Sequence, residues 1–502
     1  MSRERPNLLL IMTDEQPVQT VSAYGYGLVE TPNLDRLSQE GTLFQRAYTT
    51  SPVCTPARAG LLTGIYPHNT GAWANHLALG QDIKTIGHYY RAQGYRTAYI
   101  GKWHLDGLDY FGTGVCPDEF EDEYWYDGRR HIEYLGPTRA NLWRSQSLDS
   151  VASLVEHGVD RTFTWGGQIT DRALKFLEDA GNNDDQPWVL ILSYDEPHHP
   201  WTCPPEFLEP YEDAELLIPE TFAADFEGKP QVHREWSEWM GLDEESLAYN
   251  QRMTLAATAF IDSEIGRVLD AAEGLENTYL LFTSDHGNQL GAHHLMWKGP
   301  WMYEESIRVP LMLRGPGVPR NRVEDRVVSH IDILPTLMEL CDIPVPPIMD
   351  GQSLAGVAQG GVEPAQGPSR AIVEFHRFQL DRDDFGAFYP IRCMVEDRYK
   401  LVVNLFDRDE FYDLERDPLE QVNLIDDPKY TADRDRMHRE LLEWSYVRRD
   451  AFRSPMWEQR PWSESRHFAL CKGRIRTTPP NGLAPDAHGY MTGLPIEYDF
   501  KI

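Results

Sequence analysis

The chain has 502 residues, 41% of them hydrophobic, so it can bury a large core and is expected to form about two domains. Its formal net charge of −32 at pH 7 argues against nucleic acid or an anionic membrane as a partner, because both need a basic surface. The same charge repels an anionic substrate unless basic side chains and a metal ion make the site locally positive.

The first residues lead directly into a strand-like segment without a signal peptide, and no apolar stretch approaches the length of a membrane span. We therefore expect a cytoplasmic protein that does not bind a membrane. The six cysteines are scattered and include no Cys-x-x-Cys pair, which argues against a disulfide framework and against a zinc site.

Four apolar segments, each followed at once by acidic, lysine or histidine residues, are typical of strands buried on both faces of a parallel sheet. They are residues 6–13, 97–100, 188–194 and 279–283. Helix-like stretches alternate with them, at residues 31–41, 85–93, 170–180 and 253–273. This alternation predicts an α/β fold with a doubly wound, mostly parallel sheet. Ligands of such sheets bind outside the carboxyl ends of the strands, so the four polar clusters should share one crevice.

Residues 51–64 place a nucleophile in an anion-binding position. Pro56 suits the first turn of a helix, and Gly64 suits its end. Cys54 then lies at the helix N-terminus, where unpaired N–H groups favour an anionic oxygen or a thiolate. Arg58 follows four residues later on the same face and can reach the same anion.

The residues that follow the first and fourth strands predict a metal site. Asp14 and Glu15 come after the first strand, and Asp285 and His286 come after the fourth. Three acids brought together without a counterion would repel one another and raise their own pKa values. A hard divalent cation removes that cost and prefers oxygen ligands, while the histidine also admits a borderline metal such as Mn²⁺.

The second half of the chain changes character, with a helix expected at 329–340 and a linker rich in Gly, Ala, Gln and Pro at 355–369. Three short strands and a closing helix are expected after it, at residues 371–375, 391–395, 399–403 and 434–449.

We therefore expect a catalytic α/β domain over residues 1–355, and a smaller C-terminal antiparallel α+β subdomain with its tail over residues 370–502. Residues 110–165 and 205–250 are aromatic and charged without apolar periodicity, so they are expected to be insertions or long loops that shape the site.

The pattern Cys54-x-Pro-x-Arg58, with Leu-Thr-Gly behind it, resembles the signature of the type I sulfatases of the alkaline phosphatase superfamily. Further similarities are Gly-Lys-Trp-His at 101–104, Pro-His-x-Pro at 197–200 and Tyr-Asp-Leu at 412–414. The resemblance implies an alkaline-phosphatase-like fold and hydrolysis of aryl or carbohydrate sulfates. It also implies that a formylglycine-generating enzyme oxidises Cys54 to formylglycine, whose hydrate attacks sulfur.

The resemblance further implies a metal site, usually occupied by Ca²⁺, whose ligands match Asp14, Glu15, Asp285 and His286 together with the side chain at Cys54. This chain departs from the family pattern twice, with Glu15 where Asp is common and His286 where Asn is common. A histidine there is seen among phosphonate monoester hydrolases and choline sulfatases. We expect Ca²⁺, with Mn²⁺ as the other candidate. Two roles for Glu15 stay open, direct ligation of the ion, which we expect, and a place behind the ligands.

Several basic residues gain roles from the same resemblance. It implies that Lys102 holds the geminal diol and the sulfate oxygens, while His104 takes the proton whose removal expels sulfate. It implies that His198 and Lys298 contact the sulfate and the leaving oxygen, so that either can be the general acid. The other candidates for substrate binding are His199 and His293.

Two other functions stay open at this point. His286 favours a phosphonate monoester or phosphodiester hydrolase of the same superfamily, and a Cys54 that is never oxidised would leave an anion-binding protein without catalysis. The expected partner is a small-molecule or saccharide sulfate ester, and assembly into a homo-oligomer stays open as well.

Overall fold

The computed structural model describes residues 5–145, 147–181, 186–214, 217–223, 225–275, 277–361, 369–380, 388–450 and 453–463. The chain divides into two compact units, Met1–Ile425 and Asp426–Ile502. Much of the expected linker at 355–369 and of the C-terminal tail after residue 463 lies outside the described residues, as does Cys471.

An eight-stranded sheet forms the centre of the first unit, with the strand order β3-β4-β1-β5-β7-β2-β6 and β8 paired to β2. Four neighbouring strands are parallel, as the sequence predicts. They are β1 (Asn7–Thr13), β3 (Arg96–Gly101), β4 (Trp188–Ser193) and β5 (Thr278–Ser284). Every residue of β4 and β5 is buried, which explains their continuous apolar sequences.

The other half of this sheet is mixed and was not expected from the sequence. It contains β2 (Thr42–Tyr48), β6 (Arg308–Val309), β7 (Leu311–Arg314) and β8 (Arg322–Ser329). Both β6 and β7 pair with β2 in antiparallel fashion. Pro310 separates the two strands, because proline lacks the N–H that a continuous strand needs.

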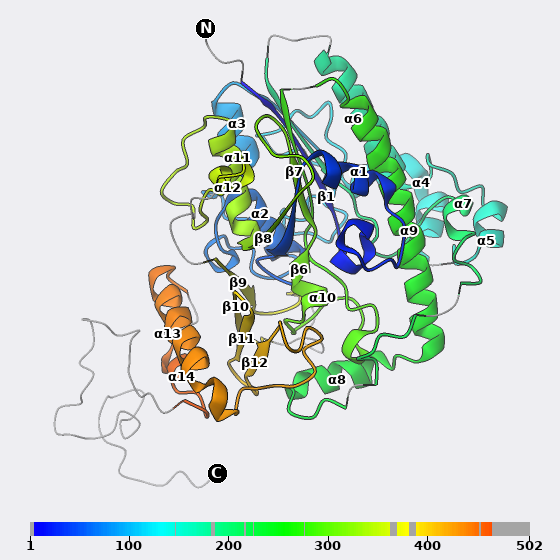
Figure 1. Cartoon of the computed structure of the whole chain (residues 1–502). Coiled ribbons are helices and arrows are strands. Elements are labelled where there is room, and N and C mark those ends of the chain that lie inside the picture. The colour runs from blue at the N-terminus through cyan, green and yellow to red at the C-terminus, as the bar shows by residue number, and fades with distance from the viewer. Residues whose placement is uncertain are drawn as a thin grey trace. The chain divides into compact units, whose positions relative to one another are not determined.

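Helices cover both faces of the sheet (Figure 1). One face carries α1 (Pro32–Glu40), α6 (Trp165–Gly181) and α9 (Glu244–Ala271). The opposite face carries α2 (Cys54–Thr63), α3 (Ile86–Ala92), α11 (Ile333–Leu340) and α12 (Ala355–Ala358). Within β1, Leu9 and Ile11 pack into the core under α1, α6 and α9. Leu8, Leu10 and Met12 pack into the core under the helices of the opposite face, as the alternation of strand side chains requires.

The segments expected as long loops contain helices. They are α4 (Gly128–Arg144), α5 (Val151–Glu156), α7 (Pro205–Leu208) and α8 (Gln231–Met240). In addition, α6 and α9 begin several residues before the positions expected from the sequence. Aromatic side chains from these segments, such as Trp143 and Trp165, are buried in the core and explain how such charged sequences fold.

A second sheet is antiparallel, with the order β12-β11-β10-β9. Its strands are β9 (Arg370–Phe375), β10 (Ile391–Glu396), β11 (Tyr399–Asn404) and β12 (Glu410–Asp413), of which β12 was not expected as a strand. Tyr48 and Val53 share a buried cluster with Val373 and Cys393 of this sheet. The sheet therefore belongs to the unit Met1–Ile425, and the domain division expected at 355–370 stays a prediction.

The second unit contains α13 (Thr431–Val447), close to the helix expected at 434–449, and α14 (Pro455–Glu458). His438 on α13 forms a hydrogen bond with the carbonyl of Trp457, which ties the two helices together. In the described part of the chain, no helix is both long enough and apolar enough to cross a bilayer.

Replacement of Gly101 by alanine tests the packing at the site edge of the sheet. Gly101 has φ +116°, and a Cβ built there would lie 2.0 Å from the carbonyl oxygen of Ser193. We expect Gly101→Ala to lower the free energy of unfolding by at least about 2 kcal/mol, measured by urea denaturation. The matched control is Gly356→Ala in α12, where a Cβ meets nothing within 4 Å. Equal stability of the two variants would contradict this account.

Candidate active site

The register of the parallel strands brings three acids together at the carboxyl edge of the sheet. Thr13 pairs with Ser284, and Met12 pairs with Ser193. Each acid follows one of these aligned strands, and the side chains concerned are Asp14, Asp195 and Asp285. All three are buried, and strand pairing places the strand ends that they follow at one edge of the sheet.

Helix α2 presents Cys54 to these acids. It begins at Cys54 and ends at Thr63, and Gly64 caps it with a left-handed φ of 68°, as expected. The N–H of Thr55 in its first turn donates to Asn75 Oδ1 at 3.0 Å. Cys54 is only 2% exposed, so its thiol faces the interior of the site.

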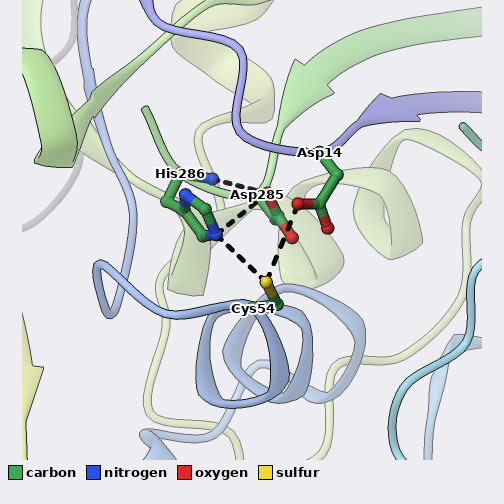
Figure 2. A group of neighbouring side chains, drawn as sticks. All are labelled: Asp14, Cys54, Asp285 and His286. Atoms are coloured by element: carbon green, nitrogen blue, oxygen red, sulfur yellow. Dashed lines mark hydrogen bonds and ion pairs between the residues drawn. The ribbon is translucent and has the colours of Figure 1, made fainter. Parts of the chain in front are cut away.

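Four donor groups converge at this point, and Figure 2 shows their side chains facing one another. One ligand atom from each of Asp14, Cys54, Asp285 and His286 lies within 4.8 Å of all the others. The Cys54 Sγ is 3.2 Å from His286 Nε2 and 3.7 Å from Asp14 Oδ1. His286 donates its Nδ1–H to the carbonyl of Gly287 at 2.9 Å, which leaves the Nε2 lone pair for a ligand.

Arg58 lies among these groups, fully buried, and does not reach outward. Its Nε donates to Asp285 Oδ2 at 2.9 Å, and one terminal nitrogen donates to Asp14 Oδ2 at 2.7 Å. The other terminal nitrogen donates to the carbonyl of Lys102 and to Ser193 Oγ. Arg58 therefore compensates the charge of two carboxylates and fixes their positions.

Lys102 is buried beside the same cluster. Its Nζ lies 2.9 Å from Asp14 Oδ2 and 2.9 Å from Asp195 Oδ1. The ring of Tyr110 covers the ammonium group at 4.9 Å from the ring centroid. This arrangement keeps a positive charge next to Cys54 without exposing it to water.

Glu15 belongs to a second group of side chains. Its Oε2 accepts from Lys298 Nζ at 2.6 Å and lies 3.4 Å from His198 Nε2, while its Oε1 accepts from Asn288 at 2.8 Å. His198 donates its Nδ1–H to the carbonyl of His199. The carboxylate of Glu15 thus orients Lys298, and its expected direct ligation of the metal stays a prediction.

The remaining predicted histidines lie in different surroundings. His104 is 3% exposed, and neither of its ring nitrogens has a hydrogen-bond partner among the described residues. The ring of His199 stacks on that of His198, with 4.1 Å between the centroids. His293 stacks on Tyr303 at 3.7 Å, and the structure describes no contact between it and the four groups around Cys54.

Burial and charge set the protonation of the cluster. Burial raises the pKa of Asp14, but Lys102 and Arg58 outweigh burial and hold that pKa well below its ordinary value. Burial and then the neighbouring Asp14 carboxylate raise the pKa of Asp285 to about 8. Burial, with Asp14 as the next cause, raises the pKa of the Cys54 thiol to about 12. Without a cation, the raised pKa of Asp285 therefore favours the protonated form of this one acid near neutral pH, while Asp14 stays ionised.

Sequence reasoning gave no role to three residues of the site. Asp195 follows a buried strand in the same way as Asp14 and Asp285, so the strand pattern could have identified it. No sequence pattern points to Tyr110 or Asn288, because both lie in segments without regular structure.

Comparison with known proteins agrees with this geometry. The family model described as Sulfatase matches residues 6–343, and the one described as N-sulphoglucosamine sulphohydrolase, C-terminal, matches residues 291–446. The chain is 44% identical to the Escherichia coli (strain K12) protein named Uncharacterized sulfatase YidJ, with 98% of each chain covered.

Two solved structures share the fold. One is a protein in complex with its substrate D-glucosamine-2-N,6-O-disulfate, with a TM-score of 0.74, 23% identity, and coverage of 89% of this chain and 99% of that one. The other is the phosphonate monoester hydrolase of Agrobacterium radiobacter, with a TM-score of 0.73, 24% identity, and coverage of 88% and 96%. The fold is thus the alkaline-phosphatase-like α/β fold. The chain belongs to the sulfatase family within the alkaline phosphatase superfamily and is a sulfuric ester hydrolase.

Metal binding should displace the proton of Asp285. Ligands must be deprotonated to bind a cation, and the pKa of Asp285 is about 8 without one. We expect binding of Ca²⁺ or Mn²⁺ at pH 7 to release about one proton and the affinity to rise between about pH 6 and pH 8. Calorimetry in buffers of different ionisation enthalpy measures both.

Two variants serve as controls for that measurement. Asp285→Asn should bind the ion more weakly and release less than one proton. Glu305→Gln should change nothing, although burial also raises the pKa of Glu305, to about 7, because this residue lies outside the cluster. Binding without proton release in the parent protein would contradict the proposed protonation.

Proposed function

We propose that Cys54 is converted to formylglycine and that one divalent cation binds beside it, so that sulfate monoesters are hydrolysed by an oxygen nucleophile at position 54. The observation that carries this proposal is the convergence of Asp14, Asp285 and His286 on the side chain of Cys54. Formylglycine supplies a hydrated aldehyde, whose hydroxyl oxygen is the nucleophile.

The donor groups fit a metal ion. The cluster offers two carboxylates, the Nε2 of His286 and the side chain at position 54, all of them buried. Oxygen donors suit Ca²⁺, which is the ion we propose, and the imidazole makes Mn²⁺ the alternative. When bound, the cation supplies positive charge that lowers the pKa of an oxygen ligand and stabilises developing negative charge.

The surroundings of Cys54 disfavour an unmodified thiol as the nucleophile. Without a cation beside it, the thiol has a pKa raised by burial to about 12 and stays protonated near neutral pH. The thiolate is the reactive form of cysteine, so a buried neutral thiol at this place attacks poorly. Modification of Cys54 is supported by the Cys-x-Pro-x-Arg pattern at residues 54–58 and by the match of the chain to the sulfatase family.

Basic side chains supply the electrostatic part of the reaction. Lys102 and Lys298 are held by buried carboxylates next to Cys54, where they can stabilise charge on the sulfate oxygens. Each preorganised donor of this kind is typically worth about 3 kcal/mol in the transition state. Arg58 acts on the reaction indirectly, because its hydrogen bonds hold Asp14 and Asp285 in place.

The hydrogen bonds favour Lys298 over His198 as the general acid. His198 donates its Nδ1–H to the carbonyl of His199, and burial followed by Lys298 holds its pKa well below the ordinary value. A neutral His198 therefore carries a lone pair and no proton on Nε2. Lys298 keeps its proton and can deliver it to the leaving oxygen.

Two histidines complete the proposal. His104 is neutral, since burial and then Lys102 lower its pKa well below the ordinary value, and it can take a proton as the general base that regenerates the aldehyde. His199 is proposed to contact the substrate. His293 is also proposed to contact the substrate, from a ring that packs on Tyr303.

The proposed substrate is a small-molecule or saccharide sulfate ester, and the proposed partner during maturation is a formylglycine-generating enzyme. The solved structure with a bound sulfated glucosamine supports the saccharide class. A cytoplasmic location and assembly into a homo-oligomer are proposals that cell fractionation and light scattering test.

Replacement of Cys54 is the direct test of the nucleophile. The peptide that carries Cys54 should show the mass of formylglycine after co-expression with the maturation enzyme, and Cys54→Ala should abolish hydrolysis of nitrophenyl sulfate, with about 10⁴-fold or greater loss. The matched control is Cys116→Ser, which replaces a partly exposed cysteine and should keep full activity. A thiol mass throughout an active preparation would refute the modification.

The second candidate is a phosphonate monoester or phosphodiester hydrolase, favoured by His286 and by the structural likeness to a phosphonate monoester hydrolase. We expect kcat/KM to be higher for nitrophenyl sulfate than for nitrophenyl phenylphosphonate, because the family assignment is to the sulfatases. The same enzyme preparation assayed with both esters gives the ratio. A ratio that favours the phosphonate by tenfold or more would establish the alternative.

A further inference from the structure

Tyr110 lies where the buried charges of the site meet the solvent. The metal cluster, Arg58 and Lys102 are almost completely buried, whereas the Tyr110 side chain is only partly buried. Its ring centroid is 4.9 Å from Lys102 Nζ and 5.7 Å from the ring of His198. One aromatic ring thus contacts two of the groups proposed to face the sulfate.

The contacts of Lys102 show what this ring contributes. An ammonium group has three N–H donors, and the carboxylates of Asp14 and Asp195 receive two of them. The face of an aromatic ring attracts a cation, and the attraction is strongest where water is excluded. The Tyr110 ring therefore adds a further favourable contact to Lys102 and keeps water away from it.

The chain holds Tyr110 in place with several contacts. Its ring packs on that of Phe111 at 4.0 Å, and Phe111 packs on Trp143 of α4 in the core. The N–H of Phe111 donates to Asp109 Oδ1, and the N–H of Arg129 in α4 donates to the carbonyl of Phe111. These contacts fix the segment that precedes α4 and hold the Tyr110 ring beside Lys102.

We propose that Tyr110 is a positioning residue for sulfate ester hydrolysis, whose ring fixes the ammonium group of Lys102 against Asp14 and Asp195 and keeps it dry. The proposal rests on the proposed function, because it takes the charge of Lys102 to act on the sulfate group. A charge that is excluded from water acts more strongly on a nearby anion, and a small displacement of such a group is costly for catalysis.

The test compares Tyr110→Phe with Tyr110→Leu in the full-length protein, with formylglycine and metal content measured for each variant. We expect Tyr110→Phe to keep kcat within about threefold of the parent, because the ring remains. We expect Tyr110→Leu to lower kcat at least about tenfold and to weaken inhibition by inorganic sulfate at least about fivefold. The inhibition constant is the informative value, since misfolding lowers the active fraction and leaves that constant unchanged.

The matched control is Tyr134→Leu, which removes an exposed tyrosine from α4 in the same segment and should leave both values unchanged. An unchanged inhibition constant in Tyr110→Leu would overturn the proposal, and so would a Tyr110→Phe variant as damaged as Tyr110→Leu. A parent protein that carries formylglycine but hydrolyses no sulfate ester would instead refute the proposed function, so the two failures can be told apart.

Discussion

One buried guanidinium connects the whole site. Arg58 reaches Asp14 after β1 and Asp285 after β5, and it also donates to the carbonyl of Lys102 after β3 and to Ser193 in β4. It therefore joins helix α2 to the ends of all four parallel strands. If the two carboxylates were buried without such a partner, the folded protein would lose several kcal/mol of stability. The rest of the site therefore depends on the contacts of Arg58.

The balance of charge explains how so acidic a chain can bind an anion. The net charge of −32 is that of the whole chain, whereas Arg58, Lys102 and Lys298 are concentrated inside the site. These cations are already matched by buried acids, so attraction of a sulfate depends on the additional charge of a divalent ion. The metal is thus needed electrostatically as well as chemically in the proposed mechanism.

Sequence alone predicted the parallel half of the sheet and the helix at Cys54, because continuous apolar runs and the positions of Pro56 and Gly64 are strong local signals. It placed Asp14 and Asp285 together for the same reason, since residues that end parallel strands share one edge. Strands β2 and β6–β8 were missed, because their pairing is mixed and their apolar runs are short or interrupted by polar residues.

Side-chain direction could not be read from the sequence. Spacing placed Arg58 on the same helix face as Cys54, but only the folded chain shows that its guanidinium pairs with Asp14 and Asp285. The same holds for Glu15, which contacts Lys298, and for Tyr110, whose role depends on contacts between segments distant in the sequence. Long-range packing decides all three.

The burial of Cys54 has a consequence for the order of events during synthesis. Only 2% of this residue is accessible once α2 has docked against the strand ends. An enzyme that oxidises this side chain must reach it, and the folded site leaves almost none of it accessible. Maturation as proposed must therefore precede the closing of the fold, and a chain that folds too quickly would be trapped as an inert, correctly shaped by-product.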